Sequence, residues 1–296
     1  MTSGSLPPAI TVSALLRATP LETLDARVLL AHALGWRRTE LITRNDEPLD
    51  PNAVDAFRSL EARRVAGEPI AQIVGVREFY GLDFEVTPDV LIPRPETELL
   101  VETALAAIGS VPRARVLDLG TGSGAIAVAI ASARPDARVW AVDRSAAAIA
   151  VAARNAARLL DPRRPGGSIA WLQGDWYGAF DAGPSSARAS VPALLEFDLI
   201  VSNPPYIASG DPHLDEGDLR FEPRGALTDE SDGLTAIRAI VTGSGPFLAN
   251  GASLWIEHGY DQAAEVRALF AAAGFADVRS LQDLAGIERT TGGRRV

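Results

Sequence analysis

From residue 114 onward the sequence alternates between short apolar runs and longer stretches of helical periodicity, and this alternation restricts the fold more than any other feature. The apolar runs predict strands at residues 115–119, 138–142, 169–172, 197–201 and 253–257. The stretches between them predict helices at residues 125–133, 146–160, 234–248 and 263–273. Such repetition predicts a doubly wound α/β fold with a mostly parallel sheet, helices on both faces, and ligands bound beyond the carboxyl ends of the strands.

The first part of the chain has a different pattern. Residues 11–72 carry apolar side chains at helical spacing, interrupted by Pro20, Gly35, Pro48 and Pro51. We therefore predict an N-terminal domain, residues 1–75, built as a small bundle of short helices. Short alternating runs around Gly81 predict a β-hairpin linker at residues 76–92, which leads into a larger domain at residues 93–296.

The composition excludes several kinds of chemistry. The chain has no cysteine, and all 28 of its basic residues are arginine, so cysteine nucleophiles, thiolate metal sites and lysine Schiff bases are excluded. Its three histidines, His32, His213 and His258, lack metal-binding spacing, so we expect no metal. The net charge of −10 argues against a protein that binds nucleic acid over a wide surface.

Targeting signals are also missing from the sequence. No apolar run approaches the roughly 18 to 20 residues that a membrane crossing needs. The first residues, MTSGSLPPAI, lack the basic and apolar regions of a signal peptide. We therefore expect a cytoplasmic protein that does not enter a membrane.

The stretch 115-RVLDLGTGSGAIAVAIA-131 is typical of a strand, a glycine loop and a helix. Gly120, Gly122 and Gly124 allow the backbone to approach a ligand closely, and the helix behind them presents free N–H groups. The pattern also fits the looser dinucleotide fingerprint, so a nicotinamide cofactor remains an alternative. A tight turn without a ligand is the third interpretation.

Asp143 ends the second predicted strand, 19 residues after Gly124. At this position a carboxylate can accept hydrogen bonds from both hydroxyl groups of an adenosine ribose. The alternative is that Asp143 caps the helix that begins near Ser145. Both roles are compatible with the sequence.

Three further side chains near the strand ends suit parts of an adenosine-containing cofactor. Asp175 can accept from an adenine amino group while Trp176 contacts the face of the ring, although a core tryptophan is an equal alternative. Asp118, just before the glycine loop, can hold an ammonium group directly or through water. A cationic sulfonium cofactor with an amino-acid tail would use such carboxylates, whereas a dinucleotide would bring an anionic pyrophosphate.

The segment 203-NPPY-206 ends the fourth predicted strand. Asn203 offers a side-chain carbonyl and Pro204 a backbone carbonyl, and Pro205 stiffens the turn so that both oxygens can bind the hydrogens of one planar NH₂ group. Tyr206 can stack on the conjugated system that carries this group. Together with the glycine loop, the segment indicates methylation of a conjugated amine or amide nitrogen; a simple strand end is the alternative.

Other functions compete with this interpretation. A nucleic-acid amino-methyltransferase would use the same NPPY segment but would need a flipped base and a basic track for phosphates. A non-catalytic protein that only binds S-adenosylmethionine, or a nicotinamide oxidoreductase, would have no use for Asn203 and Tyr206.

The sequence resembles the PrmC/HemK family of peptide chain release factor N5-glutamine methyltransferases over nearly its whole length. The resemblance is carried by 92-IPRPETE-98, 116-VLDLGTGSGAIAVAIA-131, 139-VWAVDRS-145, 174-GDW-176, 200-IVSNPPYI-207, 211-DPHL-214, 220-RFEP-223 and 257-EHG-259. It implies a seven-stranded, Rossmann-like methyltransferase domain behind a helical N-terminal substrate-recognition domain. It also implies methyl transfer from S-adenosylmethionine, which leaves S-adenosylhomocysteine, to the glutamine of the GGQ loop in class 1 release factors, in support of translation termination.

The resemblance also implies roles for individual residues. Its catalytic and substrate-binding segment corresponds to Asn203, Pro204, Pro205 and Tyr206. Its cofactor-binding residues correspond to Gly120, Thr121, Gly122, Ser123, Gly124, Asp143, Trp176 and Asn203. We expect no metal cofactor, no direct contact with nucleic acid, and a monomer.

Some segments leave their roles open. Arg94, Glu96 and Glu98 either close over the cofactor or only cap the next helix. Phe221, Glu222 and Pro223 either line the entrance for a peptide or form a surface loop, the latter being the simpler interpretation. His258 is expected to be a structural histidine. The stretch 181–193 is longer than the connection typical of the family.

Overall fold

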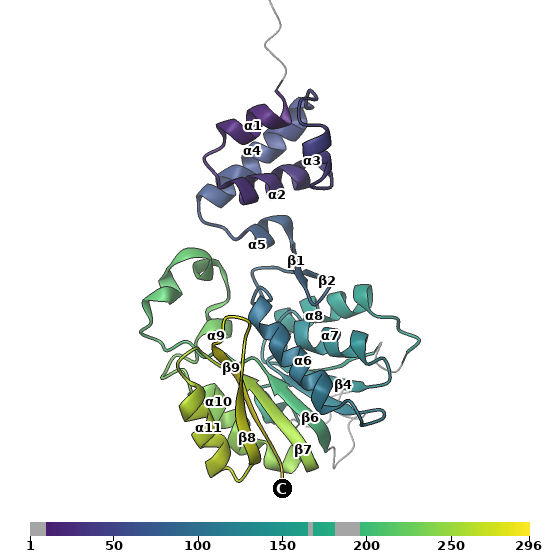
Figure 1. Cartoon of the computed structure of the whole chain (residues 1–296), viewed down its shortest axis with the longest axis vertical. Coiled ribbons are helices and arrows are strands. Elements are labelled where there is room, and N and C mark those ends of the chain that lie inside the picture. Colours follow the sequence, from purple (N-terminus) through teal and green to yellow (C-terminus); the bar gives the residue numbers. More distant parts are fainter. Residues whose placement is uncertain (1–9, 165–167, 181–195) are drawn as a thin grey trace, which may run out of the picture. The chain divides into compact units, whose positions relative to one another are not determined.

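The computed structural model describes residues 10–164, 168–180 and 196–296. The chain divides into two compact units, Met1–Gly75 and Val76–Val296. Figure 1 labels most of the helices and strands of both units. We describe each unit by itself.

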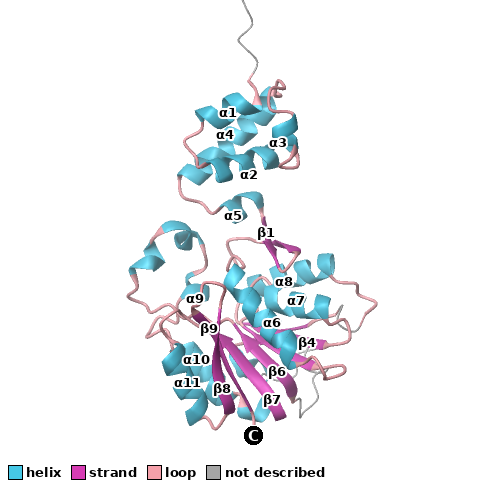
Figure 2. Cartoon of the chain, in the orientation of Figure 1, coloured by secondary structure: helices cyan, strands magenta, loops and turns pink. Residues whose placement is uncertain are grey.

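The described part of the first unit consists of helices joined by loops (Figure 2). Gly35 ends the second helix in a left-handed conformation, and the Asp50 carboxylate caps the fourth helix, where Pro51 is the first residue. A buried cluster that includes Leu29, Leu30 and Phe57 forms its core. The predicted bundle of short helices is confirmed: α1 (Val12–Ala18), α2 (Thr23–Leu34), α3 (Glu40–Thr43), α4 (Pro51–Val65) and α5 (Ile70–Val74).

Seven strands within the described residues of the second unit form one sheet in the order β5-β4-β3-β6-β7-β9-β8. The first five pair in parallel, and β9 and β8 are antiparallel to their neighbours. This confirms the predicted doubly wound, mostly parallel sheet. The strands are β3 (Arg115–Leu119), β4 (Arg138–Asp143), β5 (Ala170–Gln173), β6 (Phe197–Ser202), β7 (Leu248–Glu257), β8 (Ala276–Gln282) and β9 (Glu288–Arg294).

The strand order reverses between β3 and β6. From β3 the chain proceeds outward to β4 and β5, then returns to β6 on the other side of β3. The connections therefore diverge at the carboxyl ends of these two central strands, which leaves a crevice where doubly wound sheets bind ligands.

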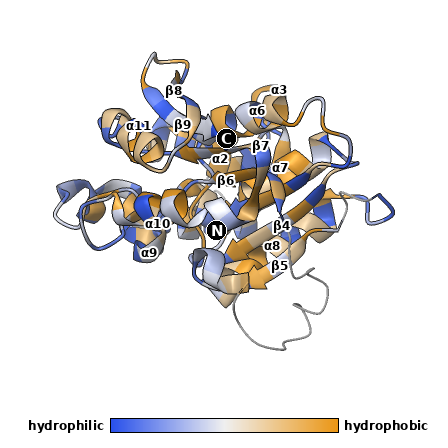
Figure 3. Cartoon of the chain, turned by 90° about the horizontal axis from the view of Figure 1, so that it is seen from below, coloured by the Kyte–Doolittle hydropathy of each residue, from blue (hydrophilic) through white to orange (hydrophobic). Residues whose placement is uncertain are grey.

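Helices cover both faces of the sheet (Figure 1). One buried cluster joins α6, α7 and α8 to the sheet, and the other joins α10 and α11 to the opposite face. Hydrophobic colour follows the central strands in Figure 3, as expected for strands that are buried on both faces. The helices are α6 (Glu98–Ala107), α7 (Ala125–Ala133), α8 (Ala146–Leu159), α9 (Arg224–Leu227), α10 (Thr235–Gly243) and α11 (Ala263–Ala272).

The hairpin of β1 (Val76–Phe79) and β2 (Leu82–Glu85) packs into the second unit. Its turn contains Tyr80 and Gly81, both with positive φ. Phe79 and Phe84 are buried in the cluster that contains α6 and α7. The hairpin is thus held by the core of this unit as well as by its own pairing.

The end of one helix and two of the strands differ from what the sequence pattern predicted. The helix predicted at residues 234–248 ends at Gly243, and β7 already begins at Leu248. Gly245 and Pro246 explain this end, because glycine is a poor helix former and proline cannot donate to the helix. The apolar pattern did not predict strands β8 and β9. Strand β8, at the sheet edge, contains several exposed polar residues, and β9 has the polar, glycine-containing sequence ERTTGGR.

Candidate functional site

A cavity of about 310 Å³ lies at the carboxyl ends of the central strands. Its walls come from the loop after β3, the ends of β4 and β5, the segment after β6 and residues 89–97. The structure therefore brings together side chains that are far apart in the sequence. The predicted site residues in its lining are Gly120, Thr121, Gly122, Ser123, Asp143, Asp175, Trp176, Asn203 and Pro205.

The glycine loop folds tightly over the end of β4. The backbone N–H groups of Gly120 and Thr121 both donate to the carbonyl of Val142, at 2.9 Å. Gly120 has φ 76°, and a Cβ atom there would lie 3.3 Å from the ring of Trp176. The loop needs glycine at this position because of both its backbone conformation and the approach of the indole ring.

Asp118 lies beneath this loop rather than in the cavity lining. Its carboxylate accepts a hydrogen bond of 2.6 Å from the hydroxyl of Thr121. Burial raises the pKa of Asp118 to about 7, the hydroxyl of Thr121 and the backbone of Ala127 lower it, and the charge of Asp143 raises it. The buried Asp118 is therefore placed to support the glycine loop through Thr121 and not to contact a ligand in the cavity.

Asp143 faces the cavity and joins two parts of its wall. One carboxylate oxygen accepts from the backbone N–H of Gly122 and the other from that of Ser145, both at 2.9 Å. The helix cap itself is Ser145, whose side chain accepts from the N–H of Ala148. The capping alternative for Asp143 is therefore wrong, and its carboxylate oxygens retain acceptor capacity toward the cavity.

Trp176 begins a short 3₁₀ helix (Trp176–Phe180) directly after β5. It adopts φ 48°, an unusual conformation for a bulky residue. Its ring lies against Gly120 and packs partly against the core cluster behind the sheet. Trp176 thus contributes both to the cavity wall and to the core, as the two sequence interpretations allowed.

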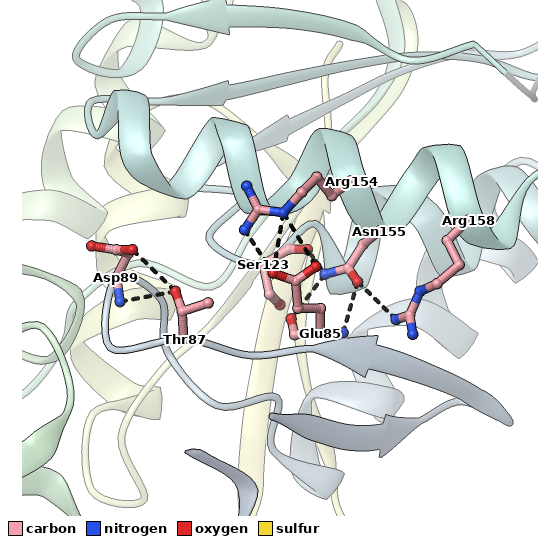
Figure 4. A network of polar contacts seen from close by, with 7 residues as sticks. All are labelled: Glu85, Thr87, Asp89, Ser123, Arg154, Asn155 and Arg158. Atoms are coloured by element: carbon pink, nitrogen blue, oxygen red, sulfur yellow. Dashed lines mark hydrogen bonds and ion pairs between the residues drawn. The ribbon is translucent and has the colours of Figure 1, made fainter. Parts of the chain in front are cut away.

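Asn155 was not singled out from the sequence, yet it connects the hairpin to the glycine loop (Figure 4). Its side-chain amide nitrogen donates to the carbonyls of Ser123 and Glu85, each at 3.0 Å. Its amide oxygen accepts from the N–H of Glu85 at 2.7 Å. An asparagine inside an amphipathic helix gives no sequence signal for this role, because the partners belong to β2 and the loop after β3.

Asn203 lies at the junction of two cavities. It lines the larger one and also a smaller cavity of about 80 Å³, together with Pro204 and Tyr206. Its side-chain Nδ2 donates to the hydroxyl of Thr97 at 3.1 Å. With the donor end of the amide engaged by Thr97, the carbonyl end is available as an acceptor.

Tyr206 is held at both its backbone and its hydroxyl group. Its carbonyl accepts a hydrogen bond of 3.0 Å from the side chain of Gln262, and its hydroxyl donates to Glu257 at 3.4 Å. Burial, with the nearby charge of Glu257, raises the pKa of Tyr206. The phenol therefore stays neutral and serves as an apolar wall with a fixed hydroxyl.

Arg94 lines both cavities and forms an ion pair with Glu222. The Glu222 side chain is fully buried, and it also accepts from the backbone N–H of Ile92 at 2.9 Å. The surface-loop interpretation is therefore wrong for Glu222, which ties the 220–223 segment to the segment that carries Arg94. Glu222 thereby orients the one guanidinium group that reaches both cavities among the described arginines.

The other open segments have structural partners. Glu98 accepts from the backbone N–H of Tyr80 at 2.9 Å and so holds the hairpin turn, whereas Glu96 is exposed. His258 is buried, with its ring nitrogens 2.9 Å from the Gly259 carbonyl and 2.7 Å from the Thr291 hydroxyl. These contacts agree with a structural histidine. The stretch 181–193 lies outside the described residues.

The described residues contain neither a metal-binding cluster nor a helix that could span a membrane. No group of three or more histidine or acidic side chains there is arranged to hold a metal ion. No described helix combines the length and the apolar character needed to cross a membrane.

Comparison with known proteins identifies the family. The chain is 66% identical to the release factor glutamine methyltransferase of Burkholderia pseudomallei over 288 residues, which is 97% of each chain. The chain belongs to the release factor glutamine methyltransferase family. A second member, from Bordetella pertussis, is 53% identical over 92% of this chain and 95% of its own. The predicted family resemblance is thereby confirmed.

Domain models and solved structures agree with this family. Residues 11–75 match the PrmC N-terminal domain, and residues 95–171 match the methyltransferase small domain. A T. thermophilus 16S rRNA methyltransferase, solved in complex with AdoMet and guanosine, is 18% identical over 75% of this chain and 50% of its own, with a TM-score of 0.51. At this identity the likeness shows the fold alone, which is that of S-adenosylmethionine-dependent methyltransferases.

Proposed function

We propose that this protein transfers a methyl group from S-adenosylmethionine to the side-chain amide nitrogen of the GGQ glutamine in class 1 peptide chain release factors. The observation that carries the proposal is the 66% identity, over 97% of both chains, to a protein named release factor glutamine methyltransferase. The geometry of the two cavities supports it, since they meet at Asn203.

The larger cavity has the features that S-adenosylmethionine requires. Asp143 offers carboxylate oxygens for ribose hydroxyl groups, and Asp175 with Trp176 offers an acceptor and a ring for adenine. Gly120 to Ser123 line the cavity beside the start of α7 and leave room for the amino-acid part of the cofactor, whereas Gly124 lies against Ala152 of α8 and outside the lining. When bound there, the cofactor supplies a methyl group on a positively charged sulfur.

The smaller cavity suits the methyl acceptor. Its apolar side chains, which include Leu91, Leu219 and Leu227, can cover the methylene groups of a glutamine side chain. The carbonyls of Asn203 and Pro204 can accept the two amide hydrogens at its end. Tyr206 then lies beside the planar amide group.

The chemical demand on these residues follows from the weak nucleophilicity of an amide nitrogen, whose lone pair is delocalised. Hydrogen bonds from the NH₂ group to Asn203 and Pro204 favour a nitrogen that leaves planarity. S-adenosylmethionine held in the larger cavity would supply the methyl group to the nitrogen that Asn203 and Pro204 hold, and the carbon–sulfur electron pair would stay with sulfur. The nitrogen then releases one proton to water or to an acceptor at Asn203 or Pro204, so no strong base is needed. Alignment and fixed dipoles of this kind can contribute up to about 7 to 11 kcal/mol.

The decisive experiment offers the protein three acceptors with labelled S-adenosylmethionine: a class 1 release factor, the same factor with its GGQ glutamine replaced, and nucleic acid. We expect label only in the first, on the glutamine. Equal labelling of the glutamine-replaced factor would refute the assigned acceptor. Preferential labelling of nucleic acid would favour an amino-methyltransferase of bases instead.

We further propose that residues 1–75 recognise the release factor. Their described part is helical and belongs to a compact unit of its own, and residues 11–75 match the PrmC N-terminal domain model. Deleting them should leave cofactor binding measurable but strongly reduce methylation of a folded release factor. Undiminished methylation of the whole factor would contradict this role.

A further inference from the structure

A buried carboxyl group lies behind Asn203 that the proposed function does not use. Glu257 ends β7 and is 1% exposed, and β7 pairs with β6, so Glu257 lies beside the start of the NPPY segment. The hydroxyl of Tyr206 donates to its Oε1, whereas its buried Oε2 has no hydrogen-bond partner among the described residues. The Thr97 hydroxyl faces this carboxyl group and lowers its pKa. The charged groups that face Glu257 are Glu96 and Arg289.

Thr97 connects this carboxyl group to Asn203. A threonine hydroxyl has one hydrogen to donate and lone pairs to accept with. If its hydrogen is directed to Glu257, its oxygen can only accept, and the Nδ2 group of Asn203 donates to it at 3.1 Å. Thr97 is 4% exposed, so water does not compete freely for either position.

This arrangement distinguishes the two ends of the Asn203 amide, which are nearly equal in size and shape. With Nδ2 on Thr97, Oδ1 is the end left for the methyl acceptor. A reversed amide would present an NH₂ group to the substrate NH₂ group, and two donors cannot form the hydrogen bond that the reaction uses.

We propose that Thr97 and Glu257 are positioning residues that hold the amide of Asn203 with its carbonyl oxygen toward the substrate nitrogen. This inference rests on the proposed function, since it assigns a purpose to the orientation of Asn203 in that reaction. A helix-capping role does not account for Thr97, because its side chain makes no cap hydrogen bond at the start of α6.

The first test compares T97V, which removes the hydroxyl at constant shape, with T97S, which retains it. Misplacement of a reacting group can cost about a hundredfold in rate, so we expect T97V to lower kcat by about tenfold to a hundredfold. Cofactor affinity should stay within about threefold. T97S should restore most of the lost rate. The matched control is T103V, because Thr103, on the helix α6 that follows Thr97, is also buried but its hydroxyl donates to the Leu99 carbonyl and it lines neither cavity.

The second test is a double-mutant cycle. E257Q can donate to Thr97, which frees the threonine hydrogen to bind Oδ1 of a reversed Asn203 amide, so E257Q should lower kcat to an extent similar to T97V. Because Glu257 acts through Thr97, adding E257Q to T97V should change kcat by less than about twofold. Y206F removes the hydroxyl group of Tyr206, the other partner of Glu257. We expect its effect on kcat to be the same whether or not T97V is present.

The outcomes separate this inference from the proposed function. If the unmodified protein methylates the GGQ glutamine but T97V is as active as T103V, the positioning role is refuted while the function stands. Independent effects of T97V and E257Q would also refute it. If the unmodified protein does not methylate the glutamine, the proposed function itself fails.

Discussion

On each side of the crevice a buried carboxyl group lies beside a threonine hydroxyl. The two pairs differ in how far apart their residues are along the chain. Under the glycine loop, Asp118 bonds Thr121, three residues further along the chain. Behind the NPPY segment, Glu257 faces Thr97, and Thr97 binds Asn203, which is 106 residues away from it. Burial raises the pKa of both carboxyl groups to about 7.

The two carboxyl–threonine pairs also differ in which part of the site they support. On the glycine-loop side the pair supports a backbone shape, in which the N–H groups of the loop bond to Val142 and Asp143 and the Asp143 carboxylate lines the larger cavity. On the other side it holds the orientation of one side-chain amide. Changes on the first side should therefore alter cofactor affinity, and changes on the second should alter the rate of transfer.

The largest expected effect is on the second side. N203A removes the acceptor, and N203D replaces the amide with a charge near the sulfonium, so both should lower kcat by about a hundredfold or more. Both should keep cofactor affinity within about tenfold, a change of roughly 1.4 kcal/mol. Single-turnover methyl transfer and calorimetric titration of the cofactor measure the two effects. Near-normal transfer by N203A would show that the segment is only a structural turn.

The reciprocal effect is expected at Asp143. D143A removes the acceptors assigned to the ribose hydroxyls, so cofactor affinity should fall by about a hundredfold, equivalent to roughly 3 kcal/mol, while the fold stays intact. At saturating cofactor, kcat should change far less than in N203A. Calorimetry with a circular-dichroism control measures this. Unchanged affinity would show that Asp143 does not bind the cofactor. It would also contradict the expectation that the two sides affect cofactor affinity and kcat separately.

The pH dependence of stability tests the buried carboxyl groups. The folded-state pKa of Glu257 is raised from 4.5 to about 7, so its stabilising contribution is present at low pH and is lost as pH rises through about 7. E257Q does not titrate, and between pH 5 and pH 8 it should gain roughly 2 kcal/mol of unfolding free energy relative to the unmodified protein. D118N should behave in the same direction, because the pKa of Asp118 is also raised. Denaturant titrations at both pH values decide this, and a constant difference would contradict it.

The smallest effect concerns the shape of the glycine loop. G120A places a Cβ atom in a left-handed conformation and 3.3 Å from the Trp176 ring, whereas G122A meets the same kind of conformation with no atom within 4 Å. We expect both variants to lose about 1 kcal/mol of unfolding free energy from the backbone, and G120A to lose about 1 kcal/mol more from the contact. Equal losses would show that the indole ring adjusts freely.

The sequence predicted the parts of the fold whose signals are local. The five parallel strands, the glycine loop and α7 each carry a continuous apolar or glycine pattern, and each lies close to its expected position. The limits of α10 and the strands β8 and β9 did not follow from the pattern. Their residues are polar or glycine-rich, and pairing with β7 makes them strands.

Within the site, the sequence indicated which residue types face a ligand but not what holds them. It singled out Asp143, Trp176 and Asn203, and the structure brings all three to one cavity. It did not indicate Asn155 or Thr97 as supports, and it favoured a surface position for Glu222. Each of these three side chains meets its partner across elements far apart in the chain.

The sequence by itself determined the glycine loop, the strand–helix order and the kinds of functional groups available, because these depend on backbone conformation and on contacts within a few residues. Only the tertiary structure decided that Thr97 would meet Asn203 and Glu257, and that Glu222 would hold Arg94. The physical reason is that hydrogen bonds of buried side chains depend on which elements pack together, and that choice is made by the apolar faces of the whole sheet and its helices rather than by the residues that form the bonds.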